Sequence, residues 1–295
     1  MASRYYVANN GLNDTSSWSA TPTGATGASV PADGDDVFFL TLKGELSDDL
    51  NTFQTGVPDT ITVGRGCNLF IAAGSSMSIG DGTNTCTRIN YEGSGSQWAF
   101  TAAAALAIDN ININTPGVVT ITKTTNANSL DNVYVDRGTV NIRGSLKSNV
   151  YNFGGIVDCR GGGTIGILDA IAGRTVTTDA VTTLNATGSA SVTIDEGASV
   201  TTANVSGSPD RVRVNLRSTG TTATLNQKGG MVTPNGSLGT HTITNSNIFG
   251  TNATTSFITK VGLSEFALTN DPAYFGTVSP KSADNSTTNF GDGAF

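Results

Sequence analysis

A short motif in which apolar side chains alternate with polar ones recurs along this chain among Gly, Thr, Asn and Ser. Through the middle of the sequence it reads Val133-Tyr-Val135, Val140-Asn-Ile142, Ile156-Val-Asp158, Ile165-Gly-Ile167, Thr175-Val176, Val192-Thr-Ile194, Val212-Arg-Val214-Asn-Leu216 and Thr242-Ile243-Thr244. Alternation with a period of two is typical of a strand that buries one face. Many of these motifs begin 16 to 21 residues apart, which predicts coils stacked on one another. We therefore expect a solenoid, specifically a right-handed parallel β-helix.

The composition favours strands throughout. Thr (45 residues), Gly (36), Asn (27) and Ser (27) make up 135 of the 295 residues, whereas Glu occurs four times. Strong helix formers are thus scarce, while Thr and Val, which favour strands, are abundant. Only 13% of the residues are charged. This argues against a disordered chain, because such chains combine low hydrophobicity with high net charge. An all-β fold follows.

The charge balance disfavours two classes of partner. The formal net charge is −7 and the sequence pI is near 4.6, whereas nucleic-acid binding requires basic patches that face the phosphates. Anionic membranes are disfavoured for the same reason, and no stretch reaches the roughly 18 apolar residues of a membrane span. The opening Met-Ala-Ser-Arg-Tyr-Tyr leads into no apolar run, so we expect synthesis in the cytoplasm without a secretory signal.

Cysteine and histidine give no metal signature. Cys67, Cys86 and Cys159 are odd in number and widely spaced, which fits neither a zinc site nor a paired disulfide framework. We expect buried free thiols. His241 is the only histidine, and we expect it on the surface of a coil. No cofactor and no metal are predicted.

Aromatic residues divide the chain into three parts. Ten lie in the first hundred residues, three between 101 and 248, and seven after that. A solenoid must close its ends, because the last coil otherwise exposes apolar side chains and strand edges. We therefore expect an N-terminal cap or attachment region at 1–57, a β-helix solenoid at 58–250 and a C-terminal cap or arm at 251–295. The aromatic side chains of both ends are the candidate interaction residues: Tyr5, Tyr6, Trp18, Phe38, Phe39, Phe257, Phe266, Tyr274, Phe275, Phe290 and Phe295.

A search for catalytic groups finds weak candidates. The chain has no Gly-x-Ser-x-Gly elbow around which a triad with His241 would form. Two carboxylates across a groove can cleave a polysaccharide, and Asp158 and Asp179 are a conceivable pair two positions apart in neighbouring coils. The alternative is that these acids are solvated at the corners of coils. Asp33-Gly-Asp-Asp36 resembles part of a calcium loop but lacks the spacing of an EF-hand, so we interpret it as a turn. We therefore expect that the protein has no enzymatic activity.

The opening block carries a resemblance to a known family. Trp18-Ser19, Gly27-Ala-Ser-Val-Pro31 and Gly34-Asp-Asp-Val37 resemble the start of many tailed-bacteriophage virion proteins of the β-helical type. In those proteins a Trp-Ser turn is followed by a Val-Pro…Asp-Val strand that begins the solenoid. Members of the family serve as capsid decoration proteins, tail spikes and fibre-associated proteins. The match covers about 25 residues, and the rest of the chain shares the composition rich in Gly, Thr and Asn.

Two functions from different classes follow from the resemblance. The first is a non-enzymatic structural protein of the virion, a trimeric decoration (cement) protein that stabilises the phage head. Its partners are two further copies of itself and the major capsid protein or other virion proteins, and its location is the capsid surface. The alternative is a tail spike or fibre protein that recognises a host receptor or polysaccharide. The few aromatic residues along the solenoid count against this alternative, and the missing signal counts against a third possibility, a secreted adhesin.

Overall fold

The structure is a computed structural model with two compact units, residues 1–148 and 149–295. It describes residues 2–46, 56–71, 77–79, 85–94, 97–102, 107–123, 130–144, 147–161, 163–208, 210–217, 219–233, 241–248, 253–257, 265–268, 277–280 and 288–289.

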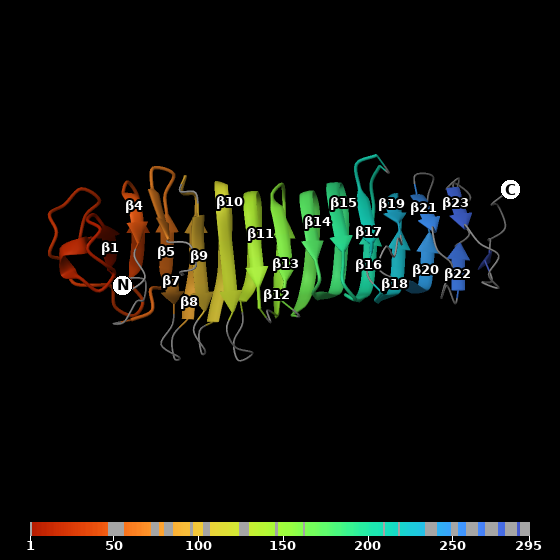
Figure 1. The fold of residues 1–295 in the computed structure, drawn as a ribbon, viewed down its shortest axis with the longest axis horizontal. Helices are drawn as coiled ribbons and strands as arrows, with labels where there is room; N and C mark the ends of the chain where they lie inside the picture. The colour runs from red at the N-terminus through yellow and green to blue at the C-terminus, as the bar shows by residue number, and fades with distance from the viewer. Residues whose placement is uncertain are drawn as a thin grey trace. The chain divides into compact units, whose positions relative to one another are not determined.

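Strands build almost all of the described chain (Figure 1). Up to residue 148 the elements are β1 (Ser3–Tyr6), the 3₁₀ turn η1 (Thr15–Ser17), β2 (Trp18–Ser19), β3 (Asp36–Phe39), β4 (Lys43–Leu46), β5 (Thr60–Val63), β6 (Asn68–Ile71), β7 (Met77–Ile79), β8 (Thr85–Tyr91), β9 (Gln97–Ala102), β10 (Ala107–Lys123) and β11 (Leu130–Arg143). They are followed by β12 (Lys147–Asn152), β13 (Ile156–Arg160), β14 (Thr164–Thr177), β15 (Ala180–Ile194), β16 (Val200–Val205), β17 (Arg213–Leu216), β18 (Thr221–Gln227), β19 (Gly230–Thr233), β20 (Thr242–Ile248), β21 (Ala253–Phe257), β22 (Glu265–Leu268), β23 (Thr277–Pro280) and β24 (Thr288–Asn289).

Parallel ladders join the coils of the first unit. β3 pairs with β5, β5 with β8, β8 with β10 and β10 with β11. Along this ladder Ile61 lies beside Ile89, and Ile111 lies between Ile89 and Val133. All four side chains are fully buried. One column of β-branched side chains therefore fills the inside of successive coils, which is the packing that the alternating motif predicted.

The N-terminal segment covers the start of this stack. β1 pairs antiparallel with β2 and parallel with β3, so parallel stacking begins ahead of the boundary expected at residue 58. Trp18 is fully buried, and its indole N–H donates to the carbonyl oxygen of Leu12 at 2.8 Å. A fully desolvated indole requires such a partner. The segment thus closes the open end of the stack with apolar side chains and pairs both edges of β1.

Two parallel ladders run through the second unit. The first half of β14 pairs with β15, and the ladder continues through β16, β18, β20, β22 and β24. The second ladder joins β13, the second half of β14, the second half of β15, β17, β19, β21 and β23. Each coil therefore contributes one segment to each ladder. The expected all-β fold of stacked parallel coils, a β-solenoid, is confirmed.

The core of the second unit is a set of thin apolar columns. Leu168, Leu184, Ala203 and Leu225 are consecutive ladder partners, and all four are buried. The narrow interior of a coil admits one such side chain per strand position, so Val, Ile, Leu and Ala suffice. This explains why the middle of the sequence needs few aromatic residues.

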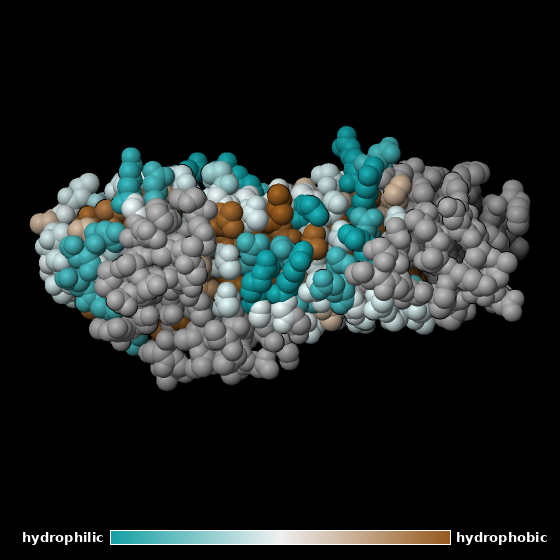
Figure 2. All heavy atoms as spheres, in the orientation of Figure 1, coloured by the Kyte–Doolittle hydropathy of each residue, from teal (hydrophilic) through white to brown (hydrophobic). Residues whose placement is uncertain are grey.

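Amides form columns on the outside of the same coils. Asn185, Asn204, Asn226 and Asn247 are ladder partners. Each of the last three donates its side-chain N–H to the Oδ1 atom of the preceding asparagine at 2.9 Å. Stacked amides of this kind also occur in cross-β assemblies. Outward positions are mainly polar, so the visible face in Figure 2 is largely teal and white where residues are described.

Candidate functional site

Three of the expected interaction residues lie in the core. Tyr6 is 2% exposed, and Trp18 and Phe39 are fully buried. The ring centroids of Tyr6 and Trp18 are 4.9 Å apart, and that of Phe39 lies 5.5 Å from that of the buried Trp98. The prediction that these three side chains form a docking surface is therefore wrong. Their physical role is to fill the wide first coils of the solenoid.

Tyr5 and Phe38 point outward on the same strands. They are ladder partners, and their rings stack at a centroid distance of 4.8 Å with an interplanar angle of 16°. Both remain half-buried, so this pair stays a candidate contact. The side chains of the six C-terminal candidates, Phe257, Phe266, Tyr274, Phe275, Phe290 and Phe295, lie outside the described residues.

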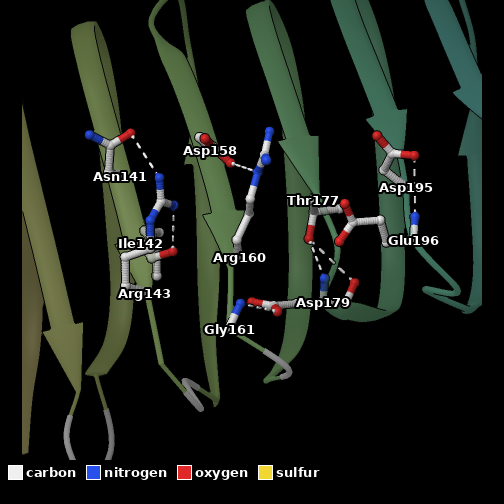
Figure 3. A network of polar contacts seen from close by, with 10 residues as sticks. All are labelled: Asn141, Ile142, Arg143, Asp158, Arg160, Gly161, Thr177, Asp179, Asp195 and Glu196. Carbon is white, nitrogen blue, oxygen red and sulfur yellow. Dashed lines mark hydrogen bonds and ion pairs between the residues drawn. The ribbon is translucent and has the colours of Figure 1, made fainter.

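The two acids of the conceivable catalytic pair have separate structural partners (Figure 3). Asp158 Oδ1 accepts a hydrogen bond from Arg160 Nε at 2.8 Å, and the two residues form an ion pair on β13. The ladder partner of Asp158 is Val176, so Asp179 lies three positions further along. The two carboxylates therefore belong to different columns, and the expected offset of two positions is wrong.

Asp179 holds the corner that follows β13. It is 1% exposed, so the expectation of a solvated acid is wrong for this residue. Its Oδ1 accepts the backbone N–H groups of Gly161 at 3.0 Å and Gly163 at 3.1 Å. Its own N–H donates to Thr177 Oγ1 at 2.9 Å. A buried carboxylate needs several such donors, and the glycines leave room for the backbone to wrap around it.

The single histidine is also structural. His241 is 5% exposed, so the expected surface position is wrong. Its Nε2 lies 2.8 Å from Oγ1 of Thr222, which is fully buried and belongs to the preceding coil of the ladder. The hydroxyl of the neighbouring coil satisfies the ring nitrogen, which allows the imidazole to be buried.

The carboxylates of the acidic segment 33–36 accept hydrogen bonds from backbone N–H groups, which agrees with its interpretation as a turn. Asp33 accepts the N–H of Val57 at 2.8 Å, and Asp35 accepts those of Ala2 at 2.8 Å and Ala32 at 3.2 Å. Within the described residues no group of three or more His, Cys, Asp or Glu side chains is placed to hold a metal ion.

A column of carboxylates runs along the first ladder of the first unit. Asp109 and Asp131 directly precede the ladder partners Asn110 and Asn132. Desolvation, followed by repulsion from Asp131 and Asp59, raises the pKa of Asp109. Thr87 lies between the coils of Asp59 and Asp109 and donates its hydroxyl to Asp59. This column is a source of pH-dependent stability.

None of the three cysteines forms a disulfide and all three are buried, as the sequence predicted. Burial raises the pKa of the Cys86 thiol to about 12 and also raises that of Cys67. A nucleophilic cysteine needs a lowered pKa and access to solvent. These thiols are therefore core side chains.

The exposed apolar residues of the described chain lie on two successive coils, in β13, β14 and the turn before β13. Among the described residues, the large hydrophobic side chains that are exposed are Phe153 (41%), Ile156 (49%), Ile167 (36%) and Ile171 (37%). We call these four residues the apolar corner. Figure 2 shows brown side chains bordered by teal ones over β13 and β14. Gathered apolar exposure on an otherwise polar protein marks an interaction site.

The bend in β14 determines where the apolar corner lies on the coil. The ladder register shifts between Ala170 and Ala172, and Gly173 has a φ of +75° that favours glycine. A Cβ atom at Gly173 would lie 2.2 Å from the carbonyl oxygen of Gly155, so the preceding coil also excludes a side chain there. Ile167 lies ahead of the bend, Ile171 lies at it, and Phe153 and Ile156 come from the preceding coil.

Sequence reasoning missed this corner. Ile156 and Ile167 belong to predicted strands, and an apolar residue in an alternating motif is normally assigned to the core. The sequence does carry one signal for the corner, because two isoleucines of this run fall on outward positions of the alternation. In the run from Ile165 to Ile171, Leu168 and Ala170 fix the inward positions, so Ile167 and Ile171 must point outward with Asp169.

No family model, no curated protein and no solved structure matches this chain in comparisons of its sequence and fold. The described part of the chain contains no helix long and apolar enough to cross a membrane.

Proposed function

We propose that this protein is a non-enzymatic structural component of a tailed-bacteriophage virion. In this proposal it acts as a trimeric decoration protein on the capsid surface and reinforces the shell. The resemblance of the opening block to β-helical virion proteins gives the class, and the strand Asp36–Phe39, which begins at the end of that block, pairs with β1 and β5 in the solenoid. The β-solenoid fold is consistent with this role and with several others.

One observation carries the choice of a structural role. The polar side chains of the coils that first suggested chemistry bond instead to their own or neighbouring coils: Asp158 to Arg160, Asp179 to Gly161 and His241 to Thr222. A catalytic groove requires acids and bases that converge on a common space. Groups engaged in coil-to-coil bonds favour a stiff brace, because stacked ladders satisfy the backbone and the polar side chains together.

The mechanism of reinforcement is mass action. A protein that binds the mature shell and not its opened form stabilises the shell by the free energy of binding. The capsid is expected to assemble without the decoration protein and to lose integrity at a lower temperature or a lower salt concentration. The partners in this proposal are two further copies of the chain and the major capsid protein or other proteins of the virion.

The position of the protein in the intact particle tests this function. Cryo-electron microscopy with an antibody against the chain should show copies distributed over the head at threefold positions. A few copies at the tail vertex would instead support a tail spike or fibre that recognises a host receptor or polysaccharide. A matched comparison of particles with and without the protein should show earlier release of DNA on heating in its absence, and equal heat resistance would contradict reinforcement.

A further inference from the structure

The apolar corner has charged flanks of opposite sign. Asp169 lies between Ile167 and Ile171 on the first half of β14, and Arg174 begins the second half beyond the bend. Arg174 is also the ladder partner of Ile156. Neither the Asp169 carboxylate nor the Arg174 guanidinium has a side-chain hydrogen bond or an ion pair with any described residue. Ile171 thus stands between the Asp169 carboxylate on one flank and the Arg174 guanidinium on the other, and the ion pair of Asp158 with Arg160 lies beyond Ile156 on the second flank.

We propose that the apolar corner is the surface at which three copies of this chain meet. Phe153 and Ile171 of each copy converge on the threefold axis, and Asp169 of each copy faces Arg174 of the next. This inference rests on the proposed trimer and assigns its contact residues. The interface is heterologous, because one flank of the corner meets the other flank of the neighbouring copy, and such contacts generate a closed ring when the rotation between copies is 120°.

Charge complementarity identifies a second copy as the occupant. A partner of strong net charge of either sign would be repelled by one flank of the corner. A second copy supplies an arginine for the aspartate and an aspartate for the arginine. The two groups are five residues apart in sequence and lie two and three residues from Ile171, so they have comparable depth on their flanks. Ion pairs with this arrangement fix register and orientation in an interface.

The repeating coil geometry supports packing side by side. Copies with parallel axes bring the same coil of each chain to the same level, so the residues of β13 and β14 in one copy meet those in the next. Four side chains alone cover less than the roughly 800 Å² per partner of a stable interface. Packing along the coils adds the neighbouring outward residues of the same unit, such as Tyr151 and Arg160, to the contact. Aromatic residues and arginine are enriched in the cores of interfaces.

The first test is the mass of the full-length protein in solution. Sedimentation velocity and native mass spectrometry should show a trimer for the natural sequence. Phe153→Ser and Ile171→Asp should each raise the dissociation constant at least about tenfold. Thr201→Asp is the matched control, because it adds a charge at an exposed position outside the corner, and it should leave the trimer intact. Far-UV circular dichroism checks that each variant keeps its strands.

The second test separates the specific pairing from general apolar contact. Asp169→Arg and Arg174→Asp should each weaken the trimer, because each places like charges opposite one another. The double variant should recover association to within about threefold of the natural protein, as a double-mutant cycle requires for residues in contact. A monomeric or dimeric natural protein, or a double variant as weak as the sum of the singles, would overturn the proposal.

These outcomes are distinguishable from those of the functional test. If every corner variant stays trimeric, the interface lies elsewhere, and the location of the protein on the particle still decides its function. If the variants dissociate as expected and the protein is found at the tail vertex, the interface stands and the decoration role fails. The heat resistance of particles that carry the Ile171→Asp variant then measures how far the shell depends on the trimer.

Discussion

The side-chain amide of Asn226 donates to Oδ1 of Asn204 at 2.9 Å, from one coil to the coil before it. Asn204 repeats the same bond toward Asn185 at 2.9 Å. Every amide in this column therefore donates in the same direction along the stack. Hydrogen bonds in such a chain polarise one another and strengthen. The asparagine column is thus a seam that joins four consecutive coils on their outer side.

Asn204→Ala is expected to remove both bonds and to lower the free energy of unfolding by about 1–3 kcal/mol, at about 0.5–1.5 kcal/mol per hydrogen bond. Asn215→Ala is the control, because Asn215 lies at an outward position of the other ladder. It should change stability by no more than about 0.5 kcal/mol. Urea unfolding followed by circular dichroism measures both. Equal effects at the two positions would show that the amide column adds nothing.

The hydrogen bonds that Asp179 accepts at the corner after β13 give a second prediction. Asp179→Ala leaves the N–H groups of Gly161 and Gly163 without their acceptor. Because the two glycines are exposed or half-buried, the loss should lower the free energy of unfolding by about 1–3 kcal/mol, at about 0.5–1.5 kcal/mol per hydrogen bond. Asp179→Asn keeps an oxygen at the same place and should cost less. Hydrogen exchange locates the effect, since the two glycine amides should exchange faster in the alanine variant and nearly normally in the asparagine variant. Unchanged exchange would show that the carboxylate does not hold the corner.

Much of the fold was predictable because its signal is local. Alternation identified the strands, and the spacing of the motifs reflects the coil: Thr175 is the ladder partner of Val192, 17 residues on, as the motif starts implied. The division of each coil between two ladders was not predictable, because strands of both ladders show the same alternation. Ile165 begins a motif close to Ile156 in sequence, yet its partner is Val181 of the next coil.

The candidate surface was harder to predict than the fold. Aromatic content suggested the chain ends, but the large volume that makes Trp18 and Phe39 good anchors also makes them good filling for a wide first coil. Whether an aromatic residue points inward depends on strand register, which the sequence leaves ambiguous by one position. The apolar corner depends on the bend at Gly173, and the bend arises from contact with the neighbouring coil.

Asp109 makes the stability of the protein depend on pH. Its folded pKa is raised above the ordinary value of 3.8, so the folded state retains this proton at pH values where the unfolded chain has lost it. The free energy of unfolding should therefore fall as the pH rises from about 4 through the folded pKa. Asp109→Asn should remove this part of the decline and should be more stable than the natural protein at pH 7.

Urea midpoints of the two proteins at pH 4 and pH 7 measure the effect. Asp210→Asn serves as control, because Asp210 is exposed in a turn of the second unit. This variant should show the same pH dependence as the natural protein. An equal or steeper loss of stability with rising pH in Asp109→Asn would contradict the raised pKa of Asp109, which desolvation and then repulsion from Asp131 and Asp59 produce.

The buried thiols give the final prediction. Desolvation raises the pKa of Cys86 to about 12, so its thiolate fraction at pH 8 is on the order of 10⁻⁴, and the thiolate is the reactive form. Cys67 and Cys159 are equally buried. The native protein should therefore react with an aromatic disulfide reagent only at the rate of its opening, and the unfolded chain should release three equivalents at once. Ser199→Cys, at an exposed position, should add one rapidly reacting thiol to the native protein. Rapid labelling of the natural protein without urea would show that a coil opens at a cysteine, and labelling of the Cys86→Ala variant would show whether that cysteine is Cys86.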